Sequence, residues 1–168
     1  MVNHKGESRI AAVLLAAGES TRMAEMKALL PWTSGQPLLA YQADAIDSAG
    51  YRPIVVVLGH MASRLREELC DYPNAEVVEN TRYQQGRSTS IVEGLRILPH
   101  DIDGILILSV DQPRSTNLLM TLKEAWSESL PPVAVPSLQG RAGHPPLFSA
   151  DLRPELSSIV EEREGLRE

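Results

Sequence analysis

A chain of 168 residues is long enough for one well-packed domain and too short for two of ordinary size. Its net charge of −6 argues against a nucleic-acid partner, since such proteins usually carry a basic patch. No apolar run approaches the roughly 18 residues of a membrane span, and the first, 10–17, lacks a cleavage-like end. We therefore expect one domain over 1–168, a cytoplasmic location, and neither nucleic acid nor membrane as partner.

The chain alternates between runs typical of strands and segments typical of helices. Three of the predicted strands are continuously apolar, which is typical of strands covered by helices on both faces. This alternation predicts an α/β fold, a three-layer α/β/α sandwich around a Rossmann-like, mostly parallel sheet. In chain order we expect strands over 10–15, 54–58, 75–78, 105–110 and 133–135 and around Leu147, with helices over 37–49, 62–70, 88–98 and 115–128, and a surface loop over 137–146.

The first predicted strand ends in a loop of small residues that is followed by two cations. Ala16, Ala17 and Gly18 let backbone N–H groups approach phosphate oxygens. Arg22 and Lys27 would supply positive charge to the same anion. The spacing alone is equally compatible with a phosphate-binding loop and with an ordinary strand-to-helix turn that carries two surface cations.

A carboxylate follows the buried run that ends at Val110. Asp111 lies at the carboxyl end of that predicted strand, and Gln112 and Pro113 come next. Mg²⁺ typically takes one or two protein carboxylates and completes its shell with phosphate and water, so this position suits a metal ligand. The alternative is a turn-forming aspartate that caps the following helix.

A polar segment precedes the helix predicted over 88–98. Ser88 or Ser90 would cap this helix, and the N–H groups at its start favour a ligand oxygen or a base edge. Plain capping and ligand binding are both compatible with either serine.

Taken together, these motifs resemble the signature of the MobA-like nucleotidyltransferases, a family that includes the enzymes that attach CMP or GMP to molybdopterin. LAAGESTRM followed by KALLP is similar to the first family motif, with Ala24 in the place of the usual glycine. DQP at 111–113 is similar to the metal-binding motif, and the stretch 80–90 to a nucleotide-binding segment. GHPPLF at 143–148 resembles the segment on the acceptor side of the cleft.

The resemblance implies a Mg²⁺-dependent enzyme that transfers a nucleoside monophosphate to a small phosphorylated acceptor and releases pyrophosphate. It implies that Arg22, Lys27 and Asp111 are catalytic, with Asp111 as the metal ligand, and that Gln112 and His144 lie near the acceptor. The nucleotide-binding residues implied in this way are Leu15, Ala16, Ala17, Gly18, Arg22, Lys27, Asn80, Gly86 and Ser90.

The same resemblance indicates which substrates and partners to expect. Family members that use CTP tend to carry Ala-Ala-Gly in the loop, so 16–18 favour CTP over GTP. The expected acceptor is molybdopterin or its molybdenum-loaded form, with a molybdenum insertase or a molybdenum hydroxylase as further partners.

Three alternatives stay open at the level of sequence. A sugar-phosphate or methylerythritol-phosphate nucleotidyltransferase would share the loop. A dinucleotide-binding oxidoreductase would share the first strand and turn, but the expected G-x-G-x-x-G is missing. Family members usually continue past a point that corresponds to Glu168 with a last strand and an Asp-Thr-Pro segment. A chain without that segment would be an impaired enzyme or a nucleotide-binding remnant.

Overall fold

A computed structural model of the chain describes residues 8–19, 26–70, 72 and 74–159. Its centre is a six-stranded sheet in which four neighbouring strands are parallel and the fifth runs antiparallel to both of its neighbours. The predicted α/β architecture with a mostly parallel sheet is therefore confirmed. Across the sheet the order is β3 (Ala75–Glu79), β2 (Ile54–Leu58), β1 (Ile10–Ala16), β4 (Gly104–Ser109), β8 (Leu147–Ser149) and β5 (Val133–Ala134).

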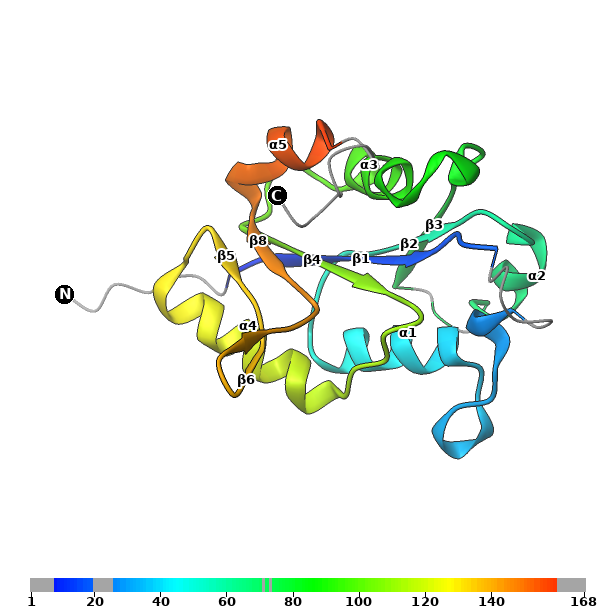
Figure 1. The fold of residues 1–168 in the computed structure, drawn as a ribbon, viewed down its shortest axis with the longest axis horizontal. Helices are drawn as coiled ribbons and strands as arrows, with labels where there is room; N and C mark the ends of the chain where they lie inside the picture. Colours follow the sequence, from blue (N-terminus) through cyan, green and yellow to red (C-terminus); the bar gives the residue numbers. More distant parts are fainter. Residues whose placement is uncertain (1–7, 20–25, 71, 73, 160–168) are drawn as a thin grey trace.

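Helices cover both faces of this sheet (Figure 1). On one face lie α1 (Leu38–Ser48) and α4 (Thr116–Ser129), with the short α2 (Ala62–Glu67) packed into the same apolar cluster. On the other face lie α3 (Arg87–Ile97) and α5 (Arg153–Ser157). Among the described helices, none combines the length and the apolar character that crossing a membrane would require.

Alternation along the buried strands divides the core into two apolar clusters. Ile10, Ala12 and Leu14 of β1 pack towards α1 and α4, whereas Ala11 and Val13 pack towards α3. All seven residues of β1 are buried, as are all five of β2 and all six of β4. Burial on both faces is the reason that these strands read as continuous apolar runs in the sequence.

A glycine brings α3 unusually close to the sheet. A Cβ atom on Gly94 would lie only 2.5 Å from Cγ1 of Val13. Glycine at this position therefore allows the helix to rest directly on β1, and this contact fixes the helix relative to the carboxyl end of that strand.

Several local details differ from the sequence prediction. Helix α2 ends at Glu67 instead of residue 70, and β5 has only two residues. The loop expected over 137–146 contains a small hairpin, β6 (Ser137–Leu138) and β7 (Arg141–Ala142), and α5 was not predicted. Four short 3-10 helices were not predicted either: η1 (Lys27–Leu29), η2 (Thr33–Gly35), η3 (Tyr83–Gln85) and η4 (Ala150–Leu152).

Candidate active site

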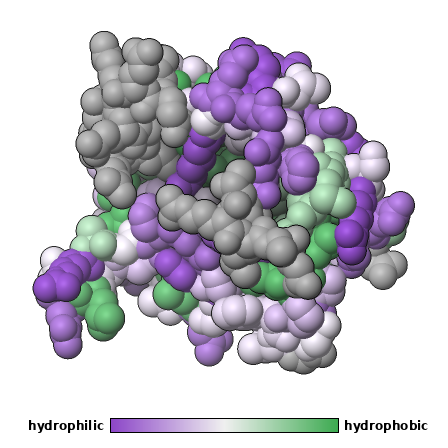
Figure 2. Space-filling model, turned by 45° about the vertical axis from the view of Figure 1, so that its right-hand side comes forward, coloured by the Kyte–Doolittle hydropathy of each residue, from purple (hydrophilic) through white to green (hydrophobic). Residues whose placement is uncertain are grey.

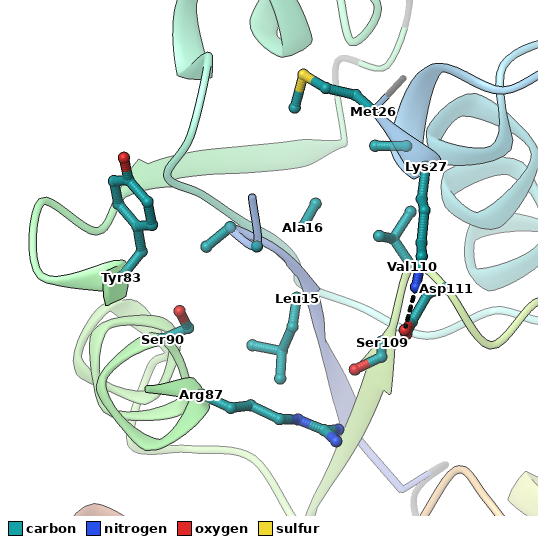
Figure 3. A pocket seen from close by; sticks show the side chains of 13 residues that line it. Leu15, Ala16, Met26, Lys27, Tyr83, Arg87, Ser90, Ser109, Val110 and Asp111 are labelled. Carbon is teal, nitrogen blue, oxygen red and sulfur yellow. Dashed lines mark ion pairs between the residues drawn. The ribbon is translucent and has the colours of Figure 1, made fainter. Parts of the chain in front are cut away.

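A cleft of about 240 Å³ opens at the carboxyl ends of β1 and β4. Figure 2 brings this side of the molecule forward and shows that its described surface is mostly hydrophilic. Four segments of the chain meet in the cleft (Figure 3). The lining residues are Leu15, Ala16, Ala17 and Gly18 at the end of β1 and just after it, Met26, Lys27 and Ala28 at η1, Tyr83, Arg87 and Ser90 around the start of α3, and Ser109, Val110 and Asp111 at the end of β4 and just after it.

The small residues after β1 form the floor of the cleft, and they are held against the end of β2. The carbonyl of Ala17 accepts the N–H of His60 at 3.1 Å. A Cβ atom on Gly59 would lie 2.7 Å from that same carbonyl oxygen and 2.8 Å from Cβ of Tyr83. Gly59 thus permits this close packing. At Gly18, by contrast, a Cβ would meet no atom within 4 Å, so this part of the backbone faces open space.

Lys27 and Asp111 form one side of the cleft, which we call the ionic wall. The Nζ of Lys27 lies 3.6 Å from Oδ2 of Asp111, and their side chains are 39% and 47% exposed (Figure 3). Asp111 does not cap the next helix, because the N-cap of α4 is Ser115, whose hydroxyl accepts the N–H of Leu118. The capping alternative for Asp111 is therefore wrong, and its carboxylate faces the cation and the cleft.

The opposite side, which we call the α3 wall, is built from buried hydrogen bonds. The Nδ2 of Asn80 donates to Oγ1 of Thr89 at 2.8 Å and to Oγ of Ser90 at 2.9 Å. Its Oδ1 accepts the N–H of Arg82 at 2.9 Å. Asn80 is 1% exposed and Ser90 is 4% exposed, so these buried hydrogen bonds hold the first turn of α3 in place.

The start of α3 corrects the prediction that Ser88 or Ser90 caps this helix. The helix begins at Arg87, and its N-cap is Gly86, with φ of 113° and no capping side chain. A positive φ of this kind favours glycine. Both serines consequently lie inside the first turn, where they are buried.

The structure brings together seven of the predicted site residues: Leu15, Ala16, Ala17, Gly18, Lys27, Ser90 and Asp111. Asn80 and Gly86 do not line the cleft: Asn80 hydrogen-bonds to Thr89 and Ser90 in the α3 wall, and Gly86 is the N-cap of α3. Arg22, which was predicted to bind the triphosphate, lies outside the described residues.

The two residues predicted on the acceptor side do not line the cleft. The carbonyl of Gln112 accepts Nε2 of Gln42 at 3.0 Å, and the carbonyl of His144 accepts Nε of Arg114 at 2.7 Å. The first bond ties the segment after β4 to α1, and the second ties it to the segment before β8.

Sequence reasoning missed several residues that line the cleft, above all Tyr83, Arg87 and Ser109. Tyr83 lies beside His60, with their ring centroids 6.2 Å apart. A usable signal existed for two of them. Ser109 is the one polar residue in an otherwise apolar run, and Arg87 stands between two residues, Gly86 and Ser90, that were singled out.

The cleft fits a divalent metal ion that is held partly by its substrate. Asp111 offers an accessible carboxylate beside the small-residue loop. Within the described segments, no three His, Cys, Asp or Glu side chains converge on a point. One carboxylate supplemented by phosphate and water is the donor set that Mg²⁺ commonly takes in nucleotide sites.

Comparisons with known proteins show similarity to a cytidylyltransferase, to an oxidoreductase and to a solved structure. The molybdenum cofactor cytidylyltransferase of Escherichia coli (strain K12) is 28% identical over 142 residues, which cover 84% of this chain and 71% of that protein. The nicotine blue oxidoreductase of Paenarthrobacter nicotinovorans is 32% identical over 168 residues, covering 94% of this chain and 79% of that protein. Rv0371c of Mycobacterium tuberculosis H37Rv, in a complex with manganese, matches with a TM-score of 0.73 at 26% identity, over 92% of this chain and 77% of that chain.

The family model described as the MobA-like NTP transferase domain matches residues 12–168. This range contains the floor of the cleft, both of its walls and most of the sheet that carries them. The chain therefore belongs to the MobA-like NTP transferases, a family of nucleotidyltransferases.

Proposed function

We propose that this chain is a Mg²⁺-dependent cytidylyltransferase that transfers CMP from CTP to the phosphate of molybdopterin or its molybdenum-loaded form. The observation that carries the proposal is the ionic wall, in which Lys27 and Asp111 face a backbone loop of small residues in one cleft. A metal–triphosphate complex needs a carboxylate to bind the metal and a cation to bind the phosphates, and Asp111 and Lys27 supply these two groups side by side. The similarity to a molybdenum cofactor cytidylyltransferase supports the choice of acceptor.

In the proposed mechanism the floor and the ionic wall position the triphosphate. Backbone N–H groups over 16–18 approach its oxygens, and Lys27 contributes positive charge, joined by Arg22. Asp111 would hold the metal, which supplies charge neutralisation to the phosphates when bound. Once Asp111 is engaged in this way, Lys27 exchanges its carboxylate partner for phosphate oxygens.

The reaction is an in-line displacement at the α-phosphorus. An oxygen of the acceptor phosphate forms the new bond to the α-phosphorus, and the bond to the bridging oxygen of pyrophosphate breaks. Such a transfer depends mainly on positioning and on stabilising charge, so it requires no nucleophile from the protein. The dinucleotide product would pass to a molybdenum insertase or a molybdenum hydroxylase in the cytoplasm.

We attribute the proposed preference for CTP over GTP to the loop. Ala17 lies close to Gly59, because a Cβ added to that glycine would come within 2.8 Å of the Cβ of Ala17. A methyl group at position 17, where GTP-using relatives tend to carry glycine, restricts how closely a large purine edge approaches the floor. Competition between the two nucleotides during turnover tests this point, and preferential use of GTP would contradict it.

One relative favours a second candidate function. By similarity to nicotine blue oxidoreductase, the second candidate is a cleft that binds the pyrophosphate of a dinucleotide cofactor in place of CTP. Oxidation of NADH or NADPH in the presence of a dye acceptor would support this candidate. Release of pyrophosphate from CTP would support the first.

The direct test is calorimetric titration with CTP and with GTP, each with and without Mg²⁺, on the wild type and on Asp111→Ala. We expect Mg²⁺-dependent binding of CTP that the variant loses. Pyrophosphate release is then measured with molybdopterin and with a panel of sugar phosphates. Failure of the wild type to bind either nucleotide would contradict the proposal. Turnover with a sugar phosphate and not with molybdopterin would mean that the acceptor is a sugar phosphate.

A further inference from the structure

A buried glutamine on α1, Gln42, holds the turn that follows Asp111. Its side chain is fully buried, and it is the one polar residue among the buried residues of α1. Burying an amide in an apolar core costs free energy unless its polar atoms are hydrogen-bonded. The bonds that Gln42 forms therefore indicate what this amide does, and the proposed mechanism gives it no role.

Both ends of the Gln42 amide bond to the backbone of the same turn. Its Nε2 donates to the carbonyl of Gln112 at 3.0 Å, and its Oε1 accepts the N–H of Arg114 at 3.2 Å. Pro113, between these two residues, has no N–H to donate. An apolar side chain at position 42 could form neither bond, and an ionised carboxylate could not donate the first. A glutamine amide is thus matched to the polar groups that the turn presents.

The bonds of Gln42 complete the support of Asp111 along the chain. On the preceding side, the N–H of Val110 donates to the carbonyl of Leu15 at 3.0 Å, which joins the end of β4 to β1. On the following side, Gln42 holds the carbonyl of Gln112. The backbone that carries Asp111 is therefore anchored to β1 before this residue and to α1 after it.

Backbone support matters at this position because the Asp111 carboxylate is itself weakly held. The side chain is 47% exposed and pairs with Lys27 at 3.6 Å (Figure 3). In the proposed mechanism Lys27 moves to phosphate oxygens, so the position of the carboxylate then depends on the backbone that carries it. Mg²⁺ requires nearly ideal octahedral geometry, and a displaced ligand weakens its binding.

We propose that Gln42 is a positioning residue for metal binding. Its amide holds the turn 111–114 so that the carboxylate of Asp111 meets the metal beside the floor of the cleft. This inference rests on the proposed nucleotidyl transfer, in which Asp111 is the metal ligand. Gln42 acts through the backbone and touches neither the metal nor the substrates. Groups that support a metal ligand in this indirect way typically change metal affinity about tenfold to a hundredfold.

Binding of a manganese–nucleotide complex tests this role. The preformed complex of Mn²⁺ with the α,β-methylene analogue of CTP is titrated into the protein, and bound Mn²⁺ is followed by the enhancement of water proton relaxation. Gln42→Met keeps the length of the side chain and removes both bonds. We expect its dissociation constant for the complex to be about tenfold higher than that of the wild type.

Tyr51→Phe is the matched control. It also removes a bond from a buried side chain to a backbone carbonyl, that of Leu119, within the same apolar cluster but away from the cleft. A general weakening of the core would affect both variants. We expect Tyr51→Phe to bind the complex with wild-type affinity.

Amide hydrogen exchange on the metal-free protein gives a readout that does not involve the metal. The N–H of Arg114 should exchange at least about tenfold faster in Gln42→Met, because it has lost its acceptor. The N–H of Val110, which bonds to Leu15, should keep its wild-type rate. Gln42→Asn, whose shorter amide cannot reach both backbone groups, should show the same losses, and it replaces Gln42→Met if that variant does not fold.

The outcomes are distinct. Failure of the wild type to bind the Mn²⁺ complex would overturn the proposed function and this inference with it. Binding with equal affinity in the wild type and in the folded Gln42 variant would overturn the inference alone. Equal losses in Gln42→Met and Tyr51→Phe would also overturn it, because the loss would then come from a weakened core.

Discussion

The two walls of the cleft differ in how their polar groups are paired: the α3 wall uses buried hydrogen bonds, and the ionic wall uses an exposed ion pair. On the α3 wall, Asn80 is buried and forms three hydrogen bonds of 2.8 to 2.9 Å that link it to Arg82, Thr89 and Ser90. On the ionic wall, Lys27 and Asp111 are about two-fifths and one-half exposed and approach each other to 3.6 Å.

This difference indicates which part of the site is rigid and which part responds to ligand. Breaking a buried hydrogen-bond network costs stability, because the groups left behind lose both water and partner. An exposed ion pair contributes little to folding, so its members exchange partners readily. Substitutions on the ionic wall should therefore affect activity, and those on the α3 wall should affect stability first.

The largest effect is expected from Asp111→Asn. The amide keeps the shape but removes the charge that would hold the metal, so we expect kcat to fall about a thousandfold, or about 4 kcal/mol. The free energy of unfolding should change by less than about 1 kcal/mol. Asp101→Asn is the control, because Asp101 pairs with Arg9 before β4, at the other edge of the sheet. A folded Asp111→Asn enzyme with wild-type kcat would show that Asp111 has no role in catalysis.

Lys27→Met should have the next largest effect. The variant loses the cation assigned to the triphosphate, and we expect kcat/KM for CTP to fall about a hundredfold, or about 3 kcal/mol. Lys123→Met provides the comparison, since the ammonium of Lys123 donates to the carbonyl of Gly50 on the opposite edge of the sheet. Equal losses in both variants would mean that Lys27 acts only through the net charge of the protein and not through contact with the triphosphate.

Asn80→Ala probes the α3 wall. It removes three hydrogen bonds from a buried site, and we expect the free energy of unfolding in urea to fall by about 2 kcal/mol. Asn74→Ala is a matched change at an exposed asparagine that bonds to Asp47, and it should cost about 0.5 kcal/mol or less. If Asn80→Ala reduced turnover while leaving stability intact, the division between the two walls would be wrong.

The smallest effect is expected at Tyr51, which supplies a buried hydrogen bond away from both walls. Its hydroxyl donates to the carbonyl of Leu119 at 2.9 Å, and Tyr51→Phe should lower the free energy of unfolding by about 1 kcal/mol near pH 8. Calorimetric unfolding of both proteins provides the measurement.

The same residue predicts a pH dependence. Burial raises the pKa of Tyr51 above its ordinary value, so the folded state keeps a proton that the unfolded chain releases above about pH 10. The contribution of the protonated Tyr51 hydroxyl to the free energy of unfolding is complete below that pH. Above it, this contribution should decline by about 1.4 kcal/mol per pH unit. Tyr51→Phe should lack this decline, and equal alkaline slopes in the two proteins would contradict the assignment.

Much of the fold could be predicted from local sequence. The continuous apolar runs of β1, β2 and β4 require burial on both faces, and helical segments between them lead to a parallel sheet. Parallel strands end at a common edge, so in such a sheet the loop after β1 and Asp111 after β4 lie on the same side. The structure places both in one cleft.

The remaining features depend on contacts between distant segments. Local sequence did not indicate that β8 would lie antiparallel between β4 and β5, because strand order is set by packing across the whole sheet. Nor did it show that Gly86 would start α3 with a positive φ and turn Ser88 and Ser90 inward.

Apolar periodicity was enough to predict the buried strands β1, β2 and β4, with the small-residue loop after β1 and the carboxylate after β4 at their common edge. The hydrogen bonds of Asn80 in the α3 wall and the direction of Arg87 towards the cleft were settled only by packing between distant segments. A side chain's direction depends on where its helix begins and on what packs against that helix. For α3 these are set by Gly86, and by the contact between Gly94 and Val13.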